Sequence, residues 1–461
     1  MPNIRVPMAM HSYTARSLPL SAQRLVNYFT EEAPPDSKMP VVLYPTPGLK
    51  LWATFGSGPI RGLHDLSGTL VVASGDEVYT AGSDASGTLR GTFSRTGIRT
   101  PVAMADNGAE VALLSGGDGY TWDGTTLSEI SDAAFLKASD VAFVDGFGCF
   151  TEEDGARFFI SSANDMTSFD ALERVTAEGK PDKLVGCVAN HRELWLWGEQ
   201  TGEVWFNSGA PDFPFERNQA AFIERGLAAK GSLQALDNTI FWLGDDLIVY
   251  RADGYTPMRV STHPIEEAIR QTASPEDATS LRHSIAGHEF YQLNFAEGTF
   301  VFDVSTGMWH ERQAHLLSRH RADCHVDIFG KTLVGDFENG KIYELDSDTY
   351  ADDGGVLATS ATSPPIHAST ARATMSRFQI EFEAGVGLTT GQGSDPQAML
   401  QFSDDGGRTW SNERWASIGA KGQNKHRAIW YRLGTFYERT MRVTMSDPVK
   451  RVIIAANAVL N

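Results

Sequence analysis

The sequence has few cysteines and no long apolar run. Its three cysteines, Cys149, Cys187 and Cys324, are widely separated and odd in number. This argues against a disulfide framework and is typical of folding in a reducing compartment. No segment approaches the ~18 consecutive apolar residues that a membrane-spanning helix requires. The first 23 residues also lack the uninterrupted apolar stretch of a secretory signal. We therefore expect no membrane insertion.

Positive charge is scarce over most of the chain. The formal net charge is −19, yet residues 401–461 hold ten Lys and Arg against five Asp and Glu. The first 400 residues therefore carry −24 and the terminal segment +5. An acidic body of this size repels nucleic-acid phosphates at long range.

A repeat runs from about residue 60 to residue 350. It consists of short alternating strands separated by turns rich in Gly, Asn and Asp, which tolerate tight hairpins. The third strand of each copy gives the register, and these strands begin at Glu77, Gly119, Arg157, Glu203, Leu247, Thr299 and Lys341. Four strands in about 40 residues, repeated seven times, predict a β-propeller of about seven blades. The one convincing helix, residues 263–270, lies in an insertion and has Pro264 at its start.

The sequence predicts an all-β protein in three parts. We expect an extended N-terminal arm over residues 1–58, a propeller over 59–355 and a small sandwich-like β module over 356–461. A turn-rich segment at 360–367 is predicted to link the last two. The arm is expected to pack on the propeller or on the C-terminal module, because pairing both chain ends would remove an exposed sheet edge.

The sharpest local motif lies in the terminal module. Ser403, Asp405, Gly407, Thr409 and Trp410 match the Asp-box pattern S-x-D-x-G-x-T-W. The motif resembles the Asp boxes of sialidases, which stabilise hairpins far from the catalytic site. Asp405 can accept hydrogen bonds from the turn, so we expect a structural hairpin here.

Evidence for catalysis or metal binding is weak. The acids lie mostly in turns, as at Glu152, Glu153 and Asp154, where we expect them to be solvated. The sequence has no nucleophile elbow, phosphate-binding loop or H-E-x-x-H motif. The densest heteroatom cluster is His310, His315, His320, Cys324 and His325, but its spacing matches no established metal motif. We predict no catalytic residue, no metal site, no cofactor and no enzymatic activity.

The same segment is predicted instead to be a patch that touches a neighbouring subunit. Its residues are His310, Arg312, His315, Arg319, His320 and Arg321.

Several motifs taken in order carry a family resemblance. They are QRLVNY (23–28), TPG (46–48), STHPIE (261–266), FD (302–303), WHER (309–312), GD (335–336), GKIYE (340–344), SDDGGRTW (403–410), IG (418–419), GQ (422–423), RLG (432–434), MRV (441–443) and SDP (446–448). With these, the chain resembles the podovirus packaged-DNA stabilisation proteins, which form the tail nozzle or hub of short-tailed bacteriophages. The early blades, as far as about residue 180, show only the repeat.

The resemblance implies a structural virion protein of the tail, assembled in the host bacterial cytoplasm. It implies a ring of copies, a hexamer, around the DNA channel that retains packaged DNA and lets it exit on infection. Implied partners are the tail adaptor or head-to-tail connector, a plug or needle, and a tailspike or fibre. DNA would pass without sequence-specific binding. The acidic body and basic terminal module would then be complementary patches of a head-to-tail contact. The alternative is a glycan-binding or glycan-hydrolysing, sialidase-like propeller, which would need a carboxylate pair or a Tyr nucleophile with an arginine cluster.

Overall fold

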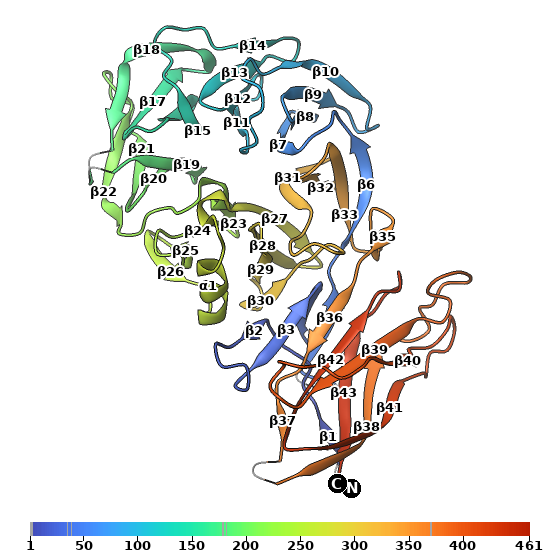
Figure 1. Ribbon diagram of the computed structural model, residues 1–461. Helices are drawn as coiled ribbons and strands as arrows, with labels where there is room; N and C mark the ends of the chain where they lie inside the picture. Colours follow the sequence, from blue (N-terminus) through green and yellow to red (C-terminus); the bar gives the residue numbers. More distant parts are fainter. Residues whose placement is uncertain (1–2, 35, 38, 178, 181, 369–370) are drawn as a thin grey trace.

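The computed structural model describes residues 3–461 except 35, 38, 178, 181 and 369–370. The predicted arm therefore includes four positions, 1–2, 35 and 38, that lie outside the described residues. Strands make up 54% of the chain and helices 3%, which confirms the all-β prediction. A ring of small sheets stands above a β-sandwich, and both chain ends lie at the far tip of the sandwich (Figure 1).

The ring contains the seven blades that the repeat predicts. Blade 1 comprises β7 (Ile60–Leu66), β8 (Thr69–Ser74), β9 (Glu77–Ala81) and β10 (Gly87–Thr92). Blade 2 comprises β11 (Ala103–Asp106), β12 (Val111–Ser115), β13 (Asp118–Trp122) and β14 (Leu127–Glu129). Blade 3 comprises β15 (Ala138–Val144), β16 (Phe147–Glu152), β17 (Arg157–Ser162) and β18 (Asp165–Thr176). Blade 4 comprises β19 (Leu184–Asn190), β20 (Glu193–Gly198), β21 (Gly202–Asn207) and β22 (Phe215–Ile223).

The last three blades adjoin the sandwich or the helix. Blade 5 comprises β23 (Gln234–Leu236), β24 (Thr239–Leu243), β25 (Val249–Asp253) and β26 (Thr256–Arg259). Blade 6 comprises β27 (Thr279–Ile285), β28 (His288–Asn294), β29 (Thr299–Asp303) and β30 (Met308–Glu311). Blade 7 takes β31 (Ala322–Ile328), β32 (Lys331–Asp336) and β33 (Lys341–Asp346) from the repeat. Short helices η1 (Lys230–Ser232) and η2 (Pro275–Asp277) flank blade 5, and α1 (His263–Arg270) follows it at the predicted residues.

Each blade begins with a tight hairpin between its first two strands. Six of these seven hairpins turn over two residues that both have positive φ, such as Ser67 (50°) with Gly68 (84°). This geometry matches the right-handed twist of the flanking strands. Blade 4 uses His191 and Arg192 at these positions, with φ of 50° and 64°. The turn is therefore imposed by the sheet even where glycine is absent.

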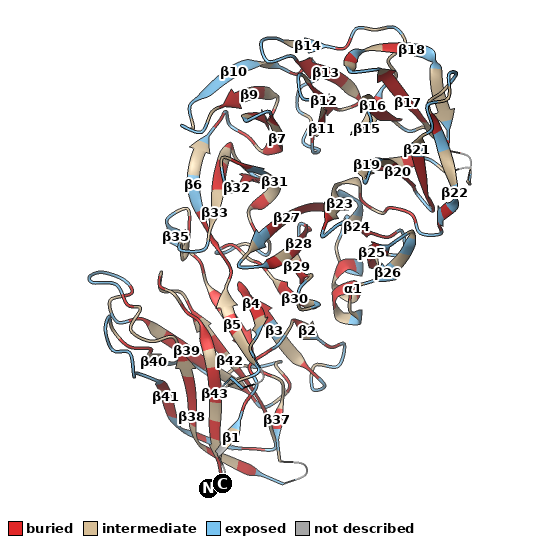
Figure 2. Cartoon of the chain, turned by 180° about the vertical axis from the view of Figure 1, so that it is seen from behind, coloured by how far each residue is buried: buried red, intermediate tan, exposed pale blue. Residues whose placement is uncertain are grey.

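The ring is closed by apolar clusters between all seven neighbouring pairs of blades. Each cluster takes buried residues from two blades, and representative members are Val71 and Leu113, Leu114 and Phe150, Phe158 and Leu196, Trp197 and Trp242, Phe241 and Tyr291, Leu281 and Val334, and Leu333 and Leu70. A single blade cannot bury both of its faces, so stacking around an axis supplies the core. The buried residues concentrate on the second and third strands of the blades, such as β12 and β20 (Figure 2).

The N-terminal segment supplies the outer strand of the last blade. β6 (Gly48–Thr54) pairs antiparallel with β33, from Thr54 opposite Lys341 to Gly48 opposite Asp346. Two short strands, β34 (Ala351–Asp352) and β35 (Gly355–Val356), extend this sheet. The first blade and the last are therefore joined by residues from before the repeat begins.

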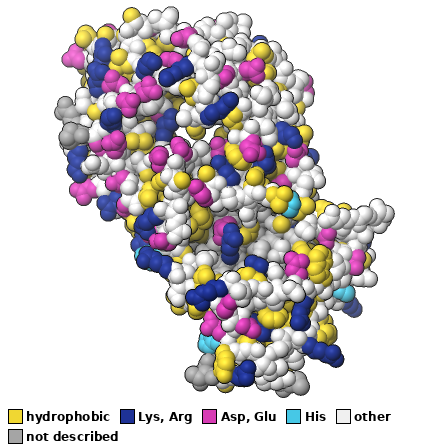
Figure 3. Space-filling model, in the orientation of Figure 1, with side chains coloured by type: hydrophobic (Ala, Val, Ile, Leu, Met, Phe, Trp, Pro, Cys, Tyr) yellow, Lys and Arg dark blue, Asp and Glu magenta, His cyan; other side chains and the backbone are white. Residues whose placement is uncertain are grey.

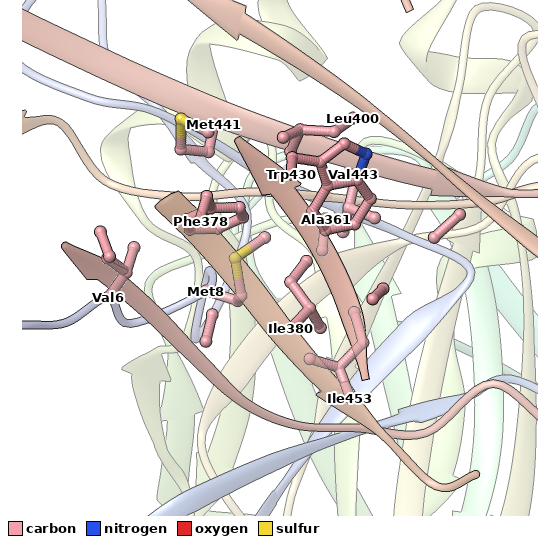
Figure 4. Packing of buried hydrophobic residues seen from close by; sticks show 14 of the residues in the cluster. Val6, Met8, Ala361, Phe378, Ile380, Leu400, Trp430, Met441, Val443 and Ile453 are labelled. Carbon is pink, nitrogen blue, oxygen red and sulfur yellow. The ribbon is translucent and has the colours of Figure 1, made fainter. Parts of the chain in front are cut away.

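The sandwich is built from both ends of the chain. One sheet has the order β4 (Tyr28–Glu32), β5 (Val41–Pro45), β43 (Ile453–Leu460), β38 (Ala373–Phe382) and β41 (Ala428–Phe436), with β1 (Asn3–Arg5) paired to β43. The facing sheet holds β3 (Ala22–Val26), β36 (Thr359–Thr362), β42 (Glu438–Met445), β39 (Gln397–Ser403) and β40 (Arg414–Ser417), with β2 (Tyr13–Thr14) on β3 and β37 (Ile366–His367) on β42. In the core between them, Val6 and Met8 lie against residues such as Phe378 and Ile453 (Figure 4). The N-terminal arm is thus an integral part of the core.

The predicted linker at 360–367 is mostly strand, and this prediction was wrong. β36 lies between β3 and β42, where Leu25 pairs with Ala361 and Ala361 pairs with Val443. The small residues of β36, TSAT (359–362), fit a crowded central position in the sheet. In the sequence, small polar residues of this kind are also typical of a turn. On its other edge β3 reaches blade 6, with Val26 beside Glu311. One continuous sheet therefore runs from blade 6 through β3 into the sandwich.

Candidate functional site

Asn27 lies where blade 6, the N-terminal segment and the sandwich meet. Its side-chain amide donates to the carbonyl oxygens of Gln313 (2.8 Å) and Ala358 (2.7 Å), and its Oδ1 accepts from the backbone N–H of Gln313 (3.0 Å). Its backbone N–H donates to Glu311 O (2.8 Å), and its carbonyl accepts from Thr46 N–H (3.1 Å). Asn27 is buried and has a φ of 55°, a left-handed conformation that Asn tolerates better than most residues. Asn27 therefore forms hydrogen bonds to all three segments.

Two buried arginines hold the same junction through backbone carbonyls. Arg312 donates from Nη2 to Pro47 O (2.7 Å), just ahead of β6. Arg451 donates to Leu357 O (2.7 Å) and Tyr350 O (2.9 Å), which flank the short strand pair of blade 7. Burial lowers the pKa of Arg312 to about 10, which leaves it charged at neutral pH. Arg312 therefore links blade 6 to the start of the closing strand β6, and Arg451 links the sandwich to the short strand pair β34–β35.

Asp352 lies buried in the segment that Arg451 holds. Burial raises the pKa of Asp352 to about 6, while the nearby charges of Arg312 and Arg451 act to lower it. Among the described residues, neither carboxylate oxygen has a hydrogen-bond partner, and Arg312 Nε and Nη1 and Arg451 Nε also lack one. Buried polar atoms of this kind are commonly satisfied by ordered water. The junction is thus polar as well as tightly packed.

Histidines of blade 6 and its exit loop complete the polar interior. His283, His310 and His320 are buried, and desolvation, with Arg312 as the next cause, lowers the pKa of each below its ordinary value. His288 lies 2.7 Å from Asp303 Oδ2 and 3.8 Å from Glu31 Oε2 of β4. Blade 6 and the N-terminal segment therefore share a titratable interior.

The predicted inter-subunit patch is wrong as a surface. Of its six residues, His310, Arg312 and His320 are buried within the chain, and only His315 is exposed. Arg319 pairs with Asp323 and stacks 4.2 Å from the Phe337 ring, and Arg321 pairs with Asp336 (2.7 Å) and Glu338 (2.6 Å). The sequence could not show that β3 and the closing strand cover this segment.

The Asp-box residues form a compact loop after β39. Ser403 Oγ donates to Asp405 Oδ1 (2.7 Å) and accepts from Gly407 N–H (2.8 Å). Asp405 accepts from the N–H (2.9 Å) and the hydroxyl (2.6 Å) of Thr409, and these bonds hold its pKa below the usual range. The Trp410 ring lies 3.9 Å from the Arg442 guanidinium. The loop orders its own backbone and packs against Pro19 and Ala22 of the N-terminal segment.

The acids predicted to be solvated are partly paired. Glu152 forms an ion pair with Arg157 (2.5 Å), and Asp154 forms one with Lys183 (3.4 Å) across to the next blade.

A cavity of about 490 Å³ opens on the propeller axis. Its wall mixes Arg99, Lys230 and Arg319 with four carboxylates, Glu153, Glu276, Asp277 and Asp323. Arg319 is bound to Asp323, and Lys230 donates to Ser139 O (2.6 Å). Within the described part of the chain, no group of three or more His, Cys, Asp or Glu side chains is placed to hold a metal ion. Nor does any helix among the described residues have the length and apolar character needed to cross a membrane.

Three of the motifs that carried the family resemblance, QRLVNY (23–28), TPG (46–48) and WHER (309–312), meet at the junction. Arg24 pairs with Glu311 (2.6 Å), Asn27 bonds beside it, and Arg312 reaches Pro47. The sequence alone does not show that these residues lie together, and nothing in the local pattern around Asp352 and Arg451 marks them as functional.

We expect Asn27→Ala to destabilise the protein by roughly 3–5 kcal/mol, since it removes three buried hydrogen bonds and leaves carbonyls unpaired. Asn27→Gly is the matched control, because it loses the same bonds but relieves the cost of positive φ, about 1 kcal/mol. Chemical denaturation measures both. An Ala variant as stable as the native chain would contradict the role of Asn27.

The fold and its junction define a class: a structural all-β protein whose seven-bladed propeller is fused through one continuous sheet to a sandwich made from both chain ends. The chain belongs to the bacteriophage P22 Gp10 family, whose beta-propeller model matches residues 4–350 and whose beta-sandwich model matches residues 360–461. It is therefore a phage structural protein that stabilises packaged DNA and a component of the virion tail. This confirms the resemblance drawn from the motifs.

No curated protein matches the sequence. Among solved structures, the chain is similar to BamB from Moraxella catarrhalis, with a TM-score of 0.42 and 10% identity, over 75% of this chain and 97% of that one. It is also similar to the Pan2 WD40 domain from Neurospora crassa, with a TM-score of 0.41 and 10% identity, over 62% of this chain and 89% of that one. Likenesses at this level say nothing about function.

Proposed function

We propose that copies of this chain form a ring around the DNA channel of a phage tail, retain the packaged DNA and let it exit on infection. The ring is a hexamer that docks on the tail adaptor above it and on a plug or needle below it. In this role the chain catalyses no reaction. Membership of the family supports the structural role, and the family match does not favour the sialidase-like alternative.

The observation that supports this most is the continuous sheet across the junction. β30 meets β3 at one parallel pair, Val26 beside Glu311, and β3, β36 and β42 are hydrogen-bonded neighbours, so a swing of the propeller on the sandwich would break this bridge and the Asn27 hydrogen bonds. A closed ring needs a fixed angle between the two contact surfaces of each subunit, since a variable angle would let the ring open. A rigid two-domain subunit meets that requirement.

Particles assembled in infected cells with and without this chain test the function. We expect particles lacking it to lose their DNA, and images of complete particles to show a six-fold ring on the tail axis. Particles that keep their DNA without the chain, or a chain located outside the tail, would contradict the proposal.

A further inference from the structure

One side of the sandwich exposes a basic surface with two aromatic side chains. We call it the basic edge: β40, the loop that follows it and β41 as far as Arg432, residues 414–432. These residues include five Lys and Arg and no Asp or Glu. The five bases, Arg414, Lys421, Lys425, Arg427 and Arg432, are all exposed. In Figure 3, Lys and Arg side chains lie on this part of the sandwich, with some Asp and Glu side chains among them.

The two aromatic side chains are far more exposed than a folded core requires. Trp415 is 59% exposed and Tyr431 is 60% exposed. β40 and β41 are the edge strands of the two facing sheets, and they are locked together because Arg414 donates to the carbonyls of Tyr431 (3.3 Å) and Arg432 (3.2 Å). Trp, Tyr and Arg are the residues that dominate binding energy at protein interfaces. The basic edge is therefore a rigid surface with the chemistry of a protein-binding site.

The chain also carries a surface of opposite charge. Glu199, Glu224, Asp245 and Asp246 are all exposed at one corner between blades 4 and 5, which we call the acidic corner. Gly226 brings these turns together: its N–H donates to Asp245 (3.0 Å), and its Cα packs so closely on the Glu199 carbonyl that a Cβ would lie 2.1 Å from that oxygen. Arg225, paired with Asp246 at 3.6 Å, is the one base in these turns.

The two surfaces lie on separate parts of the molecule. β40 and β41 lie on one side of the molecule and blades 4 and 5 on the other, in both views (Figures 1 and 2). Two surfaces on opposite sides of one chain cannot satisfy each other within that chain, but they can join successive copies head to tail. Phe222 and Met258, both partly exposed on the outer strands of blades 4 and 5, offer apolar surface for the aromatic side chains.

We infer that the basic edge of one copy docks on the acidic corner of the next, with Trp415 and Tyr431 as the anchors of the contact. This rests on the proposed ring. DNA is the other polyanion that a basic aromatic surface could bind. The acidic corner favours a second copy, because it supplies a complementary partner of matching charge in the same chain.

Photo-crosslinking in assembled particles tests this contact. Trp415 is replaced by p-benzoylphenylalanine, and Leu172, which is 85% exposed on β18 of blade 3, is replaced in the control. We expect irradiation to give a covalent dimer from position 415 alone, with crosslinked peptides from blades 4 and 5. Crosslinks from position 415 to DNA, to a different protein or to no partner would overturn the inference.

Point variants give a second readout. We expect Trp415→Ala and Tyr431→Ala to melt as the native chain does but to enter particles at least tenfold less, while Leu172→Ala enters normally. Normal incorporation of both aromatic variants would also overturn the inference. If the chain is in the particles but position 415 contacts something else, only this inference fails. If the chain is absent from native particles, the proposed function fails first.

Discussion

Leu49→Asp is expected to unfold the propeller under conditions where Leu51→Asp leaves it intact. Both residues lie on β6, the strand that the N-terminal segment adds to blade 7. Leu49 is fully buried in a cluster with Leu281 and Val334 of blades 6 and 7, whereas Leu51 is 47% exposed. Truncating a buried Leu costs about 2–5 kcal/mol, and burying an unpaired carboxylate costs more. Substitutions at exposed positions usually stay within about 0.5 kcal/mol.

Removing residues 1–55 should have a larger effect. The deletion takes the outer strand from blade 7 and β1, β3, β4 and β5 from the sandwich, so two edges are opened at once. We expect the melting temperature to fall sharply and the transition to lose cooperativity, as followed by circular dichroism and calorimetry. A melting curve unchanged by the deletion, or equal effects of the two Asp substitutions, would show that β6 does not close the propeller.

The second large effect is acid destabilisation. His283, His310 and His320 have lowered pKa values in the folded protein, and that of His310 falls to about 3. An unfolded chain has ordinary histidines near 6.5. Below that pH the histidines of the unfolded state bind protons, whereas the buried histidines of the folded state stay neutral. The free energy of unfolding is therefore highest above about pH 6.5 and falls as the pH drops.

His310, with a pKa of about 3, contributes about 2 kcal/mol of this loss between pH 6.5 and 4.5. His283 and His320 add to the loss in the same direction, because burial lowers the pKa of each. Asp352 acts in the opposite direction, because its raised pKa of about 6 makes the folded state take up a proton first as the pH falls. This offsets about 2 kcal/mol. The contributions of His310 and Asp352 are thus similar in size and opposite in sign, so the net loss of stability at low pH comes from His283 and His320.

Denaturant titrations at pH 7 and pH 5 measure this loss. We expect His310→Gln to reduce this loss by about 2 kcal/mol, because the variant lacks one buried neutral imidazole. The difference between the two pH values is the readout, so any cost of the substitution itself cancels. A protein equally stable at both pH values would contradict the buried neutral histidines.

The sequence alone predicted the features that depend on residues within a few tens of positions of one another. Alternating strands with turns between them identify a blade, and the spacing of third strands such as Glu77 and Lys341 counts the blades. The limits of α1 were also predictable, because Pro264 and the apolar positions Ile265 and Ile269 are local signals. The Asp-box loop likewise orders itself through neighbouring residues.

Tertiary structure alone decided how the two ends meet. Val26 lies beside Glu311, Leu25 beside Ala361 and Ala53 beside Ile342, pairs that no local pattern connects. The same contacts bury His310 and Arg312, which sequence analysis placed on the surface, and turn the predicted linker into a central strand. Hydrophobic periodicity records which face of a strand is apolar, but not which distant strand will cover its edge. That choice depends on the closed geometry of the whole ring and sandwich.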